Sequence, residues 1–247
     1  MLKRLLKTKR PAPSVPEGRR VYAIGDVHGR LDLFDRLLGM IEADHRARPP
    51  AAVDLVLLGD LVDRGPDSRG VVERAMNPPE WARQTTLMGN HEEIMLHVLD
   101  GDRAQLPLWL KVGGREALES WGVDPQMIAD GTISEILEAA HDAIPVRVVR
   151  WLMGLRQSMT IGDYFFVHAG VRPGVPLDRQ DKGDSFWIRE EFLESSRHHG
   201  AIVVHGHSIA TEVDWLPNRI GIDTGAYATG RLTALCLEGE EQRFLQT

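Results

Sequence analysis

The stretch AVDLVLLGDLVDRGPDS, residues 52–68, joins an apolar run to a loop that holds three aspartates and one arginine. The run predicts a strand, and its nearly continuous apolar character predicts that both faces of the strand are buried. Gly, Asp and Pro are also ordinary turn residues, so a solvated turn is the alternative interpretation of residues 59–68. Because a turn needs no partner elsewhere, the rest of the chain distinguishes the two interpretations.

The same pairing of strand and polar loop recurs along the chain. Five more apolar or β-branched runs are each followed by such a loop: VYAI (21–24) by GDVHG, TTLM (85–88) by GNHE, YFFV (164–167) by HAG, AIVV (201–204) by HGH, and IGI (220–222) by DTGA. Parallel strands present their carboxyl ends along one edge, where the sites of open α/β sheets lie. We therefore expect these loops to meet in one site.

The pattern between the strands predicts a layered fold of the α/β class (α+β layered). Residues 31–47 have apolar side chains at helical spacing, and residues 103–157 are typical of a helical insertion that caps one side of the sheets. No internal repeat is present, so residues 20–247 are expected to form one domain.

Charge divides the chain into a basic leader and an acidic body. Residues 1–20 hold seven Lys or Arg and one Glu, a net charge of +6, which leaves −13 for the rest of a chain whose total is −7. We expect the Pro-rich residues 1–19 to be disordered, with a short amphipathic membrane anchor as the alternative. An acidic body argues against nucleic-acid binding.

Cysteine content and hydropathy restrict where the chain acts. Cys236 is the single cysteine, which fits a reducing compartment, so a cytoplasmic location is expected. No apolar run reaches the ~18 residues that span a bilayer, so no transmembrane segment is predicted. A monomer is the favoured state.

The loops supply oxygen and imidazole donors without a thiolate. The donors are Asp26, His28, Asp60, Asn90, His168, His205 and His207. Imidazole with carboxylate favours Mn, Fe or Zn, whereas an all-oxygen set favours Mg or Ca. The set exceeds what one catalytic metal with an open position needs, so we predict two divalent ions bridged by Asp60. Such a pair lowers the pKa of a shared solvent molecule and accepts the oxygens of a phosphate ester.

Other polar residues of these loops are predicted to serve the substrate. Arg64 offers a bidentate fork to phosphate oxygens, which lysine cannot copy. His91 is the predicted general acid that protonates the leaving alkoxide, and Asp63 is the predicted orienting carboxylate for His91. The sequence therefore indicates phosphoester hydrolysis without a covalent phosphoenzyme.

Taken in order, the motifs GDVHG, GDLVDRG, GNHE, HAG and GHS resemble those of the phosphoprotein phosphatase (PPP) family of metallophosphoesterases. The resemblance covers about residues 21 to 240 and is closest to the bacterial and phage branch of serine/threonine phosphatases. It implies a calcineurin-like β-sandwich of two mixed sheets flanked by helices. It assigns Asp26, His28 and Asp60 to the first metal, and Asp60, Asn90, His168 and His207 to the second.

The resemblance also suggests roles around the metals. Arg189, in a W-x-R segment, is expected opposite Arg64 as a second phosphate-binding arginine, with a solvated helix arginine as the alternative. His205 is expected behind the ligands, although an exchange of roles with His207 stays open. Asp223 is expected to order its loop, and Tyr227 is a candidate neighbour of the substrate.

One segment departs from the family pattern. Many bacterial relatives have Asn in a WLxNGG segment, whereas WLKVGG here has Val112. This difference leaves open what the helical insertion contributes to substrate choice. Trp109, in the same segment, is expected to pack in the core or in the helical cap.

These observations predict a serine/threonine protein phosphatase that uses two divalent ions, Mn²⁺ first, with Fe or Zn as alternatives. Its substrate is expected to be a phosphorylated protein or peptide. Two other functions are weighed: a dinucleoside polyphosphate hydrolase of the diadenosine tetraphosphate type, and an inactive phosphoprotein-binding module. The full set of donors and the acid His91 argue against the inactive module.

Overall fold

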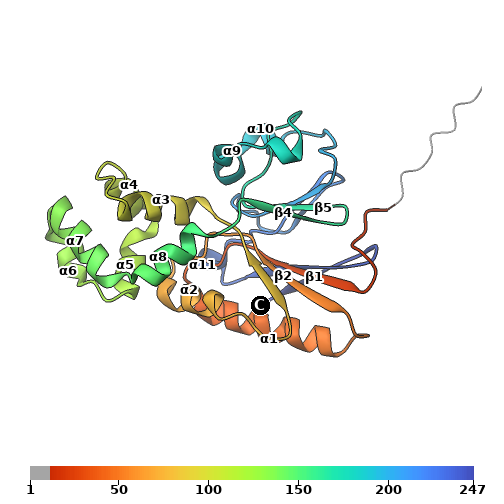
Figure 1. Ribbon diagram of the computed structural model, residues 1–247, viewed down its shortest axis with the longest axis horizontal. Coiled ribbons are helices and arrows are strands. Elements are labelled where there is room, and N and C mark those ends of the chain that lie inside the picture. Colours follow the sequence, from red (N-terminus) through yellow and green to blue (C-terminus); the bar gives the residue numbers. More distant parts are fainter. Residues whose placement is uncertain (1–11) are drawn as a thin grey trace, which may run out of the picture.

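The computed structural model describes residues 12–247 (Figure 1). The strands are β1 (Arg19–Ile24), β2 (Ala52–Leu57), β3 (Arg83–Thr86), β4 (Ser158–Ile161), β5 (Tyr164–Val167), β6 (Ile202–His205), β7 (Asp214–Trp215), β8 (Arg219–Gly221), β9 (Thr233–Glu238) and β10 (Glu241–Gln246). The helices are α1 (Leu31–Arg46), α2 (Ser68–Met76), α3 (Asn90–Leu99), α4 (Leu106–Trp109), the π-helix η1 (Leu110–Gly114), α5 (Arg115–Ser120), α6 (Pro125–Asp130), α7 (Ile133–Ala143), α8 (Val146–Met153), the 3₁₀-helix η2 (Leu177–Arg179), α9 (Lys182–Trp187), α10 (Glu190–Leu193) and α11 (Ala226–Thr229).

Two mixed five-stranded sheets form the centre of the molecule, which confirms the predicted fold class. The first has the order β10-β9-β1-β2-β3, and the second has the order β4-β5-β6-β8-β7. In each sheet three strands run parallel: β1, β2 and β3 in the first, and β5, β6 and β8 in the second. These are the six predicted strands that precede polar loops.

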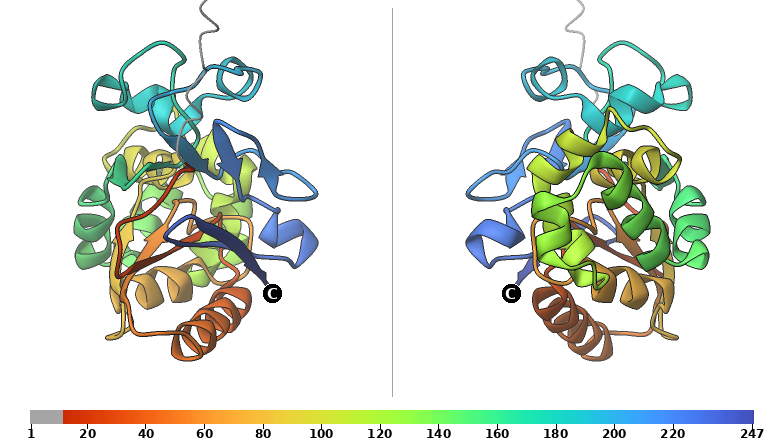
Figure 2. Two further views of the ribbon diagram at one scale, coloured as in Figure 1. Left: turned by 90° about the vertical axis from the view of Figure 1, so that its right-hand side faces the viewer. Right: turned by 90° about the vertical axis from the view of Figure 1, so that its left-hand side faces the viewer.

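The sheets face each other, and helices cover their outer faces (Figures 1 and 2). Along β1, Val21 and Ala23 pack between the sheets, whereas Tyr22 and Ile24 pack against α1 on the opposite face. On the outer face of the second sheet, Phe192 of α10 packs against strand residues. Both faces of these strands are buried, which explains why the runs are apolar rather than alternating.

The segment from residue 103 to 157 contains α4 to α8 and projects from the side of the sheets (Figure 1). Its apolar residues pack against α3 in a separate cluster that includes Trp109, Leu118 and Val148. A capping box between Thr132 and Glu135 fixes the start of α7. The insertion is therefore joined to the sheets through α3, whose first turn carries the GNHE motif.

Strand ends differ slightly from the prediction. β3 ends at Thr86 instead of residue 88: the Leu87 N–H still donates to the Leu57 carbonyl of β2 at 2.9 Å, but Leu87 then forms an isolated bridge with Arg156. Four strands were not predicted from the sequence, because none of them is followed by a polar loop of the predicted kind. They are the edge strands β4, β7 and β10 and the antiparallel strand β9.

The prediction that residues 1–19 form a disordered leader does not hold for residues 14 and 15, which contact the domain. Residues 1–11 lie outside the described part. Val15 is buried between the sheets, and its N–H donates to the Gly239 carbonyl at 3.0 Å. The Ser14 N–H donates to Asp163 at 2.9 Å, so residues 12–18 pack on the domain. From residue 12 onward, none of the helices has the length and apolar character that a bilayer span requires.

Candidate metal centre and active site

The loops that follow the parallel strands converge between the sheets, as predicted. Loops of the first sheet carry Asp26, His28, Asp60 and the GNHE motif, and loops of the second carry His168 and His207. Asp26, His28, Asp60, Asn90, His91, His168 and His207 are each exposed by 6% or less. A solvated turn is thereby ruled out for the loop around Asp60.

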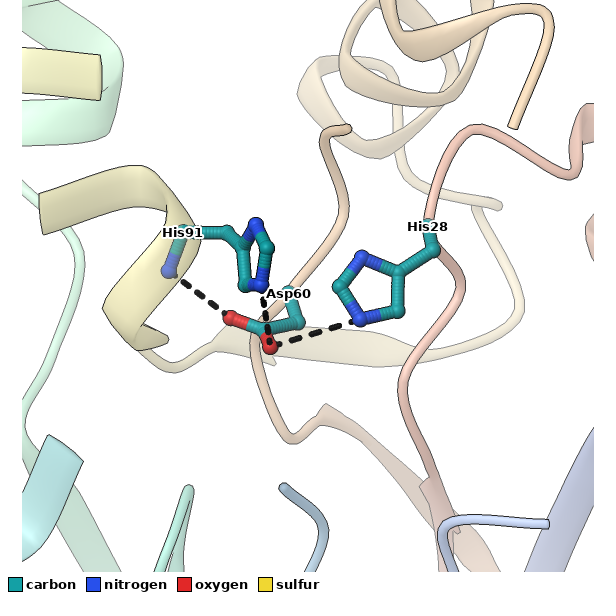
Figure 3. A group of neighbouring side chains, drawn as sticks. All are labelled: His28, Asp60 and His91. Carbon is teal, nitrogen blue, oxygen red and sulfur yellow. Dashed lines mark hydrogen bonds and ion pairs between the residues drawn. The ribbon is translucent and has the colours of Figure 1, made fainter. Parts of the chain in front are cut away.

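Asp60 lies at the centre of two groups of donor atoms. His28, Asp60 and His91 form one group, and Asp60, His168 and His207 form the other, with all donor atoms of a group within 4.8 Å of one another. Figure 3 shows the Asp60 carboxylate between the ring of His28, on a loop, and the ring of His91, on the first turn of α3. The shared carboxylate matches a bridging ligand of two cations.

Two histidines point unprotonated nitrogens at this carboxylate. Nδ1–H of His28 donates to the Val62 carbonyl at 2.8 Å, and Nδ1–H of His168 donates to the Leu58 carbonyl at 2.9 Å. Because a carbonyl only accepts, each Nε2 keeps its lone pair. Each Nε2 lies 3.4 Å from an Asp60 oxygen, so lone pairs face one another. A cation between them would turn this repulsion into coordination.

Asn90 adds to the same electron-rich pocket. Its Oδ1 lies 3.0 Å from Nε2 of His168 and 2.8 Å from Nδ1 of His207. Burial lowers the pKa of His168 to about 4 and that of His207 to about 2, so neither ring carries a second proton near neutral pH. The donor set therefore fits a divalent metal better than protons.

Asp26 lies beside His207 rather than in either donor group. Its Oδ2 accepts the His207 N–H at 2.9 Å, and its buried Oδ1 has no partner among the described residues. Burial, followed by the charges of Asp223 and Asp60, raises the pKa of Asp26 well above its usual range. A nearby cation would relieve this repulsion, so the position suits the predicted first-metal ligand.

His91 is held differently from the metal-facing histidines. Nδ1–H of His91 donates to Oδ2 of Asp63 at 2.6 Å, the pairing predicted from the sequence. Nε2 of His91 lies 4.0 Å from Oδ2 of Asp60. A carboxylate behind the ring fixes its tautomer and orientation, as for a general acid.

The two predicted phosphate-binding arginines occupy different surroundings. Nη1 of Arg64 donates to Nε2 of His28 and Nη2 donates to Nε2 of His91, both at 2.9 Å, and its guanidinium lies 4.8 Å from the Tyr227 ring centroid. Arg189 is exposed; after burial and His168, its charge contributes to the lowered pKa of His207. Both positive charges thus act on the site.

The structure places the rings of His205 and His207 in different surroundings. Nε2 of His205 lies 3.3 Å from Arg219, and its ring packs edge-on against Phe192, away from Asp60. His207 is therefore the histidine of HGH that joins the donor set. Asp223 accepts the Gly225 N–H at 2.9 Å, a hydrogen bond within the DTGA loop.

Backbone strain concentrates in this site. Within residues 12–247, the non-glycine residues with left-handed φ angles are His28, Asp60, Asp63, Arg64 and His207, with φ between 45° and 71°. Such angles are unfavourable for L-residues and are usually found where function requires them. Here they turn each side chain from its strand end into the centre.

Sequence reasoning missed two residues that hold the site. Glu92, with no exposed surface, accepts the backbone N–H groups of Asp60, Leu61, Val62 and Gly89. The indole Nε1–H of Trp109 donates to both oxygens of Asp63, at 3.0 and 3.1 Å. Glu92 lies in the quoted GNHE motif, which was the available signal; the contact of Trp109 had none.

A family model, calcineurin-like phosphoesterase, matches residues 19–232, most of the chain. The chain belongs to the calcineurin-like phosphoesterase family. It is therefore a metallophosphoesterase, a hydrolase, as the motif resemblance to the PPP family indicated. Members of the family use a binuclear divalent metal centre, and the donor set around Asp60 fits such a centre.

Some curated relatives of this chain are named bis(5'-nucleosyl)-tetraphosphatases and others serine/threonine-protein phosphatases. The asymmetrical bis(5'-nucleosyl)-tetraphosphatase PrpE of Anoxybacillus flavithermus is 24% identical, over 86% of this chain and 88% of its own. Serine/threonine-protein phosphatase 2 of Escherichia coli is 26% identical, over 87% and 91%. A symmetrical bis(5'-nucleosyl)-tetraphosphatase of Dechloromonas aromatica is 32% identical, over 62% of this chain but 44% of its own length.

Solved structures share the fold at lower identity. A crystal structure provisionally assigned as a diadenosine tetraphosphatase aligns with a TM-score of 0.63 and 22% identity, covering 95% of this chain and 98% of its own. A cold-active protein tyrosine phosphatase aligns with a TM-score of 0.62 and 18% identity, covering 95% and 81%. These likenesses support the fold and leave the substrate open.

Proposed function

We propose that this chain is a serine/threonine phosphoprotein phosphatase that transfers phosphate to water without a covalent intermediate. The residues proposed to hold two divalent ions, Mn²⁺ first, are Asp26, His28, Asp60, Asn90, His168 and His207. When bound, such ions lower the pKa of a water molecule and neutralise charge on the phosphate. The other residues bind the ester and protonate its leaving group.

The observation that carries this proposal is the 2.6 Å hydrogen bond between His91 and Asp63, both buried. A serine or threonine alkoxide is a poor leaving group and gains most from a positioned proton donor. A nucleotide phosphate leaves readily as an anion and gains less. A buried and oriented acid therefore favours a phosphomonoester with an alkoxide leaving group.

Arg64 is placed to receive the phosphate. Its two terminal nitrogens donate to His28 and His91, contacts that phosphate oxygens could replace with stronger, charge-assisted bonds. This exchange would also release Nε2 of His91 toward the leaving oxygen. Arg189, exposed at the rim, is the proposed second contact.

One observation favours the second candidate, hydrolysis of a dinucleoside polyphosphate. Arg64 and Tyr227 border a pocket of about 560 Å³ that also includes the exposed Lys111 and Arg115. Basic groups with an aromatic ring suit further phosphates and a base. Relatives named tetraphosphatases agree with this candidate.

The two candidates are separated by rates on matched substrates. The protein is stripped of metal, reloaded with Mn²⁺, Fe²⁺ or Zn²⁺, and assayed on phosphoserine and phosphothreonine peptides and on diadenosine tetraphosphate. We expect the larger kcat/KM on a phosphopeptide. A hundredfold preference for the nucleotide would overturn the proposal in favour of the second candidate.

A His91→Asn variant tests the proposed role of His91 as general acid. We expect kcat on a phosphoserine peptide to fall ~10²- to 10⁴-fold, the usual contribution of a general acid. His97→Asn, an exposed histidine on the same helix α3, is the control and should keep its rate. Wild-type turnover of the peptide by His91→Asn would remove His91 from this role.

A further inference from the structure

The hydrogen bond between His91 and Asp63 continues one step further, into the helical insertion. Trp109 ends α4 and has no exposed surface, and its indole Nε1–H reaches both oxygens of Asp63, at 3.0 and 3.1 Å. Asp63 is also fully buried, and its own N–H donates to Ser68 at 2.8 Å. Trp109, Asp63 and His91 thus form a buried chain that ends at the substrate side of the metal centre.

The contact with Trp109 restricts the Asp63 carboxylate. A carboxylate held by His91 alone could rotate about its terminal bond, because one hydrogen bond fixes only one oxygen. The indole N–H lies near both oxygens, which leaves Oδ2 directed at Nδ1 of His91. Burial raises the pKa of Asp63, and the indole bond is the main contribution that opposes this rise.

The chain packs closely around the buried ring of Trp109. The Gly113 carbonyl accepts the Arg64 N–H at 3.2 Å, which ties η1 to the substrate loop. A Cβ on Gly114 would lie 2.6 Å from the Trp109 ring, and a Cβ on Gly113 would lie 2.4 Å from the Arg64 backbone nitrogen. The two glycines of WLKVGG therefore let the insertion approach the site.

We propose that Trp109 is a positioning residue for leaving-group protonation, acting on His91 through Asp63. This inference rests on the proposed role of His91 as the general acid. In the step, water forms the new bond to phosphorus and releases a proton to solvent. Once Arg64 has turned from His91 to the phosphate, Nε2 of His91 takes a proton from solvent. The bond from phosphorus to the leaving oxygen breaks, that oxygen takes this Nε2 proton, and the ring stays bonded to Asp63 through Nδ1–H.

Leaving-group dependence separates this role from a purely structural one. Phenyl phosphate needs a proton on its leaving oxygen, whereas p-nitrophenyl phosphate expels a stable anion and needs it much less. A Trp109→Phe variant keeps a ring in the core and removes the N–H. With Mn²⁺-loaded protein we expect kcat on phenyl phosphate to fall ~10-fold or more, within the range of general-acid effects, with KM unchanged and a much smaller fall on p-nitrophenyl phosphate.

Trp121→Phe is the matched control. Trp121 is 6% exposed and packs in the same cluster as Trp109, away from Asp63. Its substitution should leave the ratio of the two rates as in the wild type. If Trp109→Phe does not fold, a tryptophan analogue with sulfur in place of the indole N–H, introduced at Trp109 alone, makes the same test without a change of shape.

A proton NMR measurement tests the role of Trp109 independently of enzyme activity. The proton between His91 and Asp63 should give a downfield signal, assigned by its loss in His91→Asn. We expect this signal to shift or broaden in Trp109→Phe and to stay in Trp121→Phe. An unchanged signal together with an unchanged ratio of rates on the two aryl phosphates would overturn the positioning role.

The aryl phosphates also separate this inference from the choice of substrate. A preference of the wild type for diadenosine tetraphosphate would overturn the proposed physiological function. The ratio of the two aryl phosphate rates in Trp109→Phe would still decide the role of Trp109.

Discussion

At the scale of single residues, Glu92 shows how a side chain outside the chemistry can define a site. Its oxygens accept N–H groups from three consecutive residues after β2 and from Gly89, at 2.7 to 3.2 Å. These N–H groups lie in a loop that turns too sharply to pair with a strand. The buried carboxylate supplies their acceptors and thereby fixes the backbone of the loop that carries Asp60.

A Glu92→Gln variant tests this role. One carboxylate oxygen becomes an NH₂ group facing backbone N–H donors, so at least one buried donor loses its partner. Each such loss costs about 1–3 kcal/mol, and we expect the free energy of unfolding of the metal-free protein to fall by at least that amount. Urea unfolding measures it. Glu138→Gln, exposed on α7, should unfold like the wild type, and an equally stable Glu92→Gln protein would contradict the interpretation.

At the scale of elements, the π-helix η1 brings the insertion to the site. Its regular geometry is interrupted at Gly113, which has φ of 123°, a left-handed angle that favours glycine. Without a side chain there, the Gly113 carbonyl can accept the Arg64 N–H. Val112 is partly buried against the insertion's core.

A Gly113→Ala substitution should therefore act on Arg64. The added Cβ would lie 2.4 Å from the Arg64 backbone nitrogen at a φ that alanine disfavours, so one of the two elements must move. We expect a loss of about 1–3 kcal/mol in stability, from strain of this kind, and a higher KM for phosphate esters. Gly39→Ala, in α1 with open space at its Cβ, is the control and should be neutral or stabilising. Equal effects of both substitutions would contradict the role of η1.

At the scale of the whole molecule, the candidate metal centre joins the two sheets. Asp26, His28, Asp60 and Asn90 follow strands of the first sheet, and His168 and His207 follow strands of the second. Ions held by both sets would link the layers and compensate the buried carboxylates. A ligand that binds only the folded state at 100 times its Kd stabilises it by about 2.7 kcal/mol.

Metal removal should consequently lower the melting temperature, and Mn²⁺ should restore it. Elemental analysis of the reloaded protein should find two ions per chain, and fewer after Asp60→Asn, which cannot bridge in the same way. Asp142→Asn, exposed on α7, should keep both ions. Two ions per chain in Asp60→Asn, or a melting temperature that does not change when the metal is chelated, would contradict a bridged centre.

The sequence by itself determined which strands are buried on both faces and which loops carry the donors. These features are local: an apolar run reports its own burial, and a polar loop at the end of a parallel strand reports the edge of the sheet. The pairing of His91 with Asp63 was also predictable, because the two residues follow neighbouring strands, β2 and β3, and a carboxylate there can orient an imidazole.

Tertiary structure alone decided the contacts between side chains that are distant in sequence. Trp109 and Asp63 are 46 positions apart, and the sequence pattern around Trp109 indicates only a core residue. The resemblance favoured His207 over His205 as the ligand but left an exchange open, and the packing of Arg219 and Phe192 around His205 determines which ring faces Asp60. Packing selects among rotamers and partners that the pattern of residue types leaves equivalent, which is why these contacts appear only in the folded molecule.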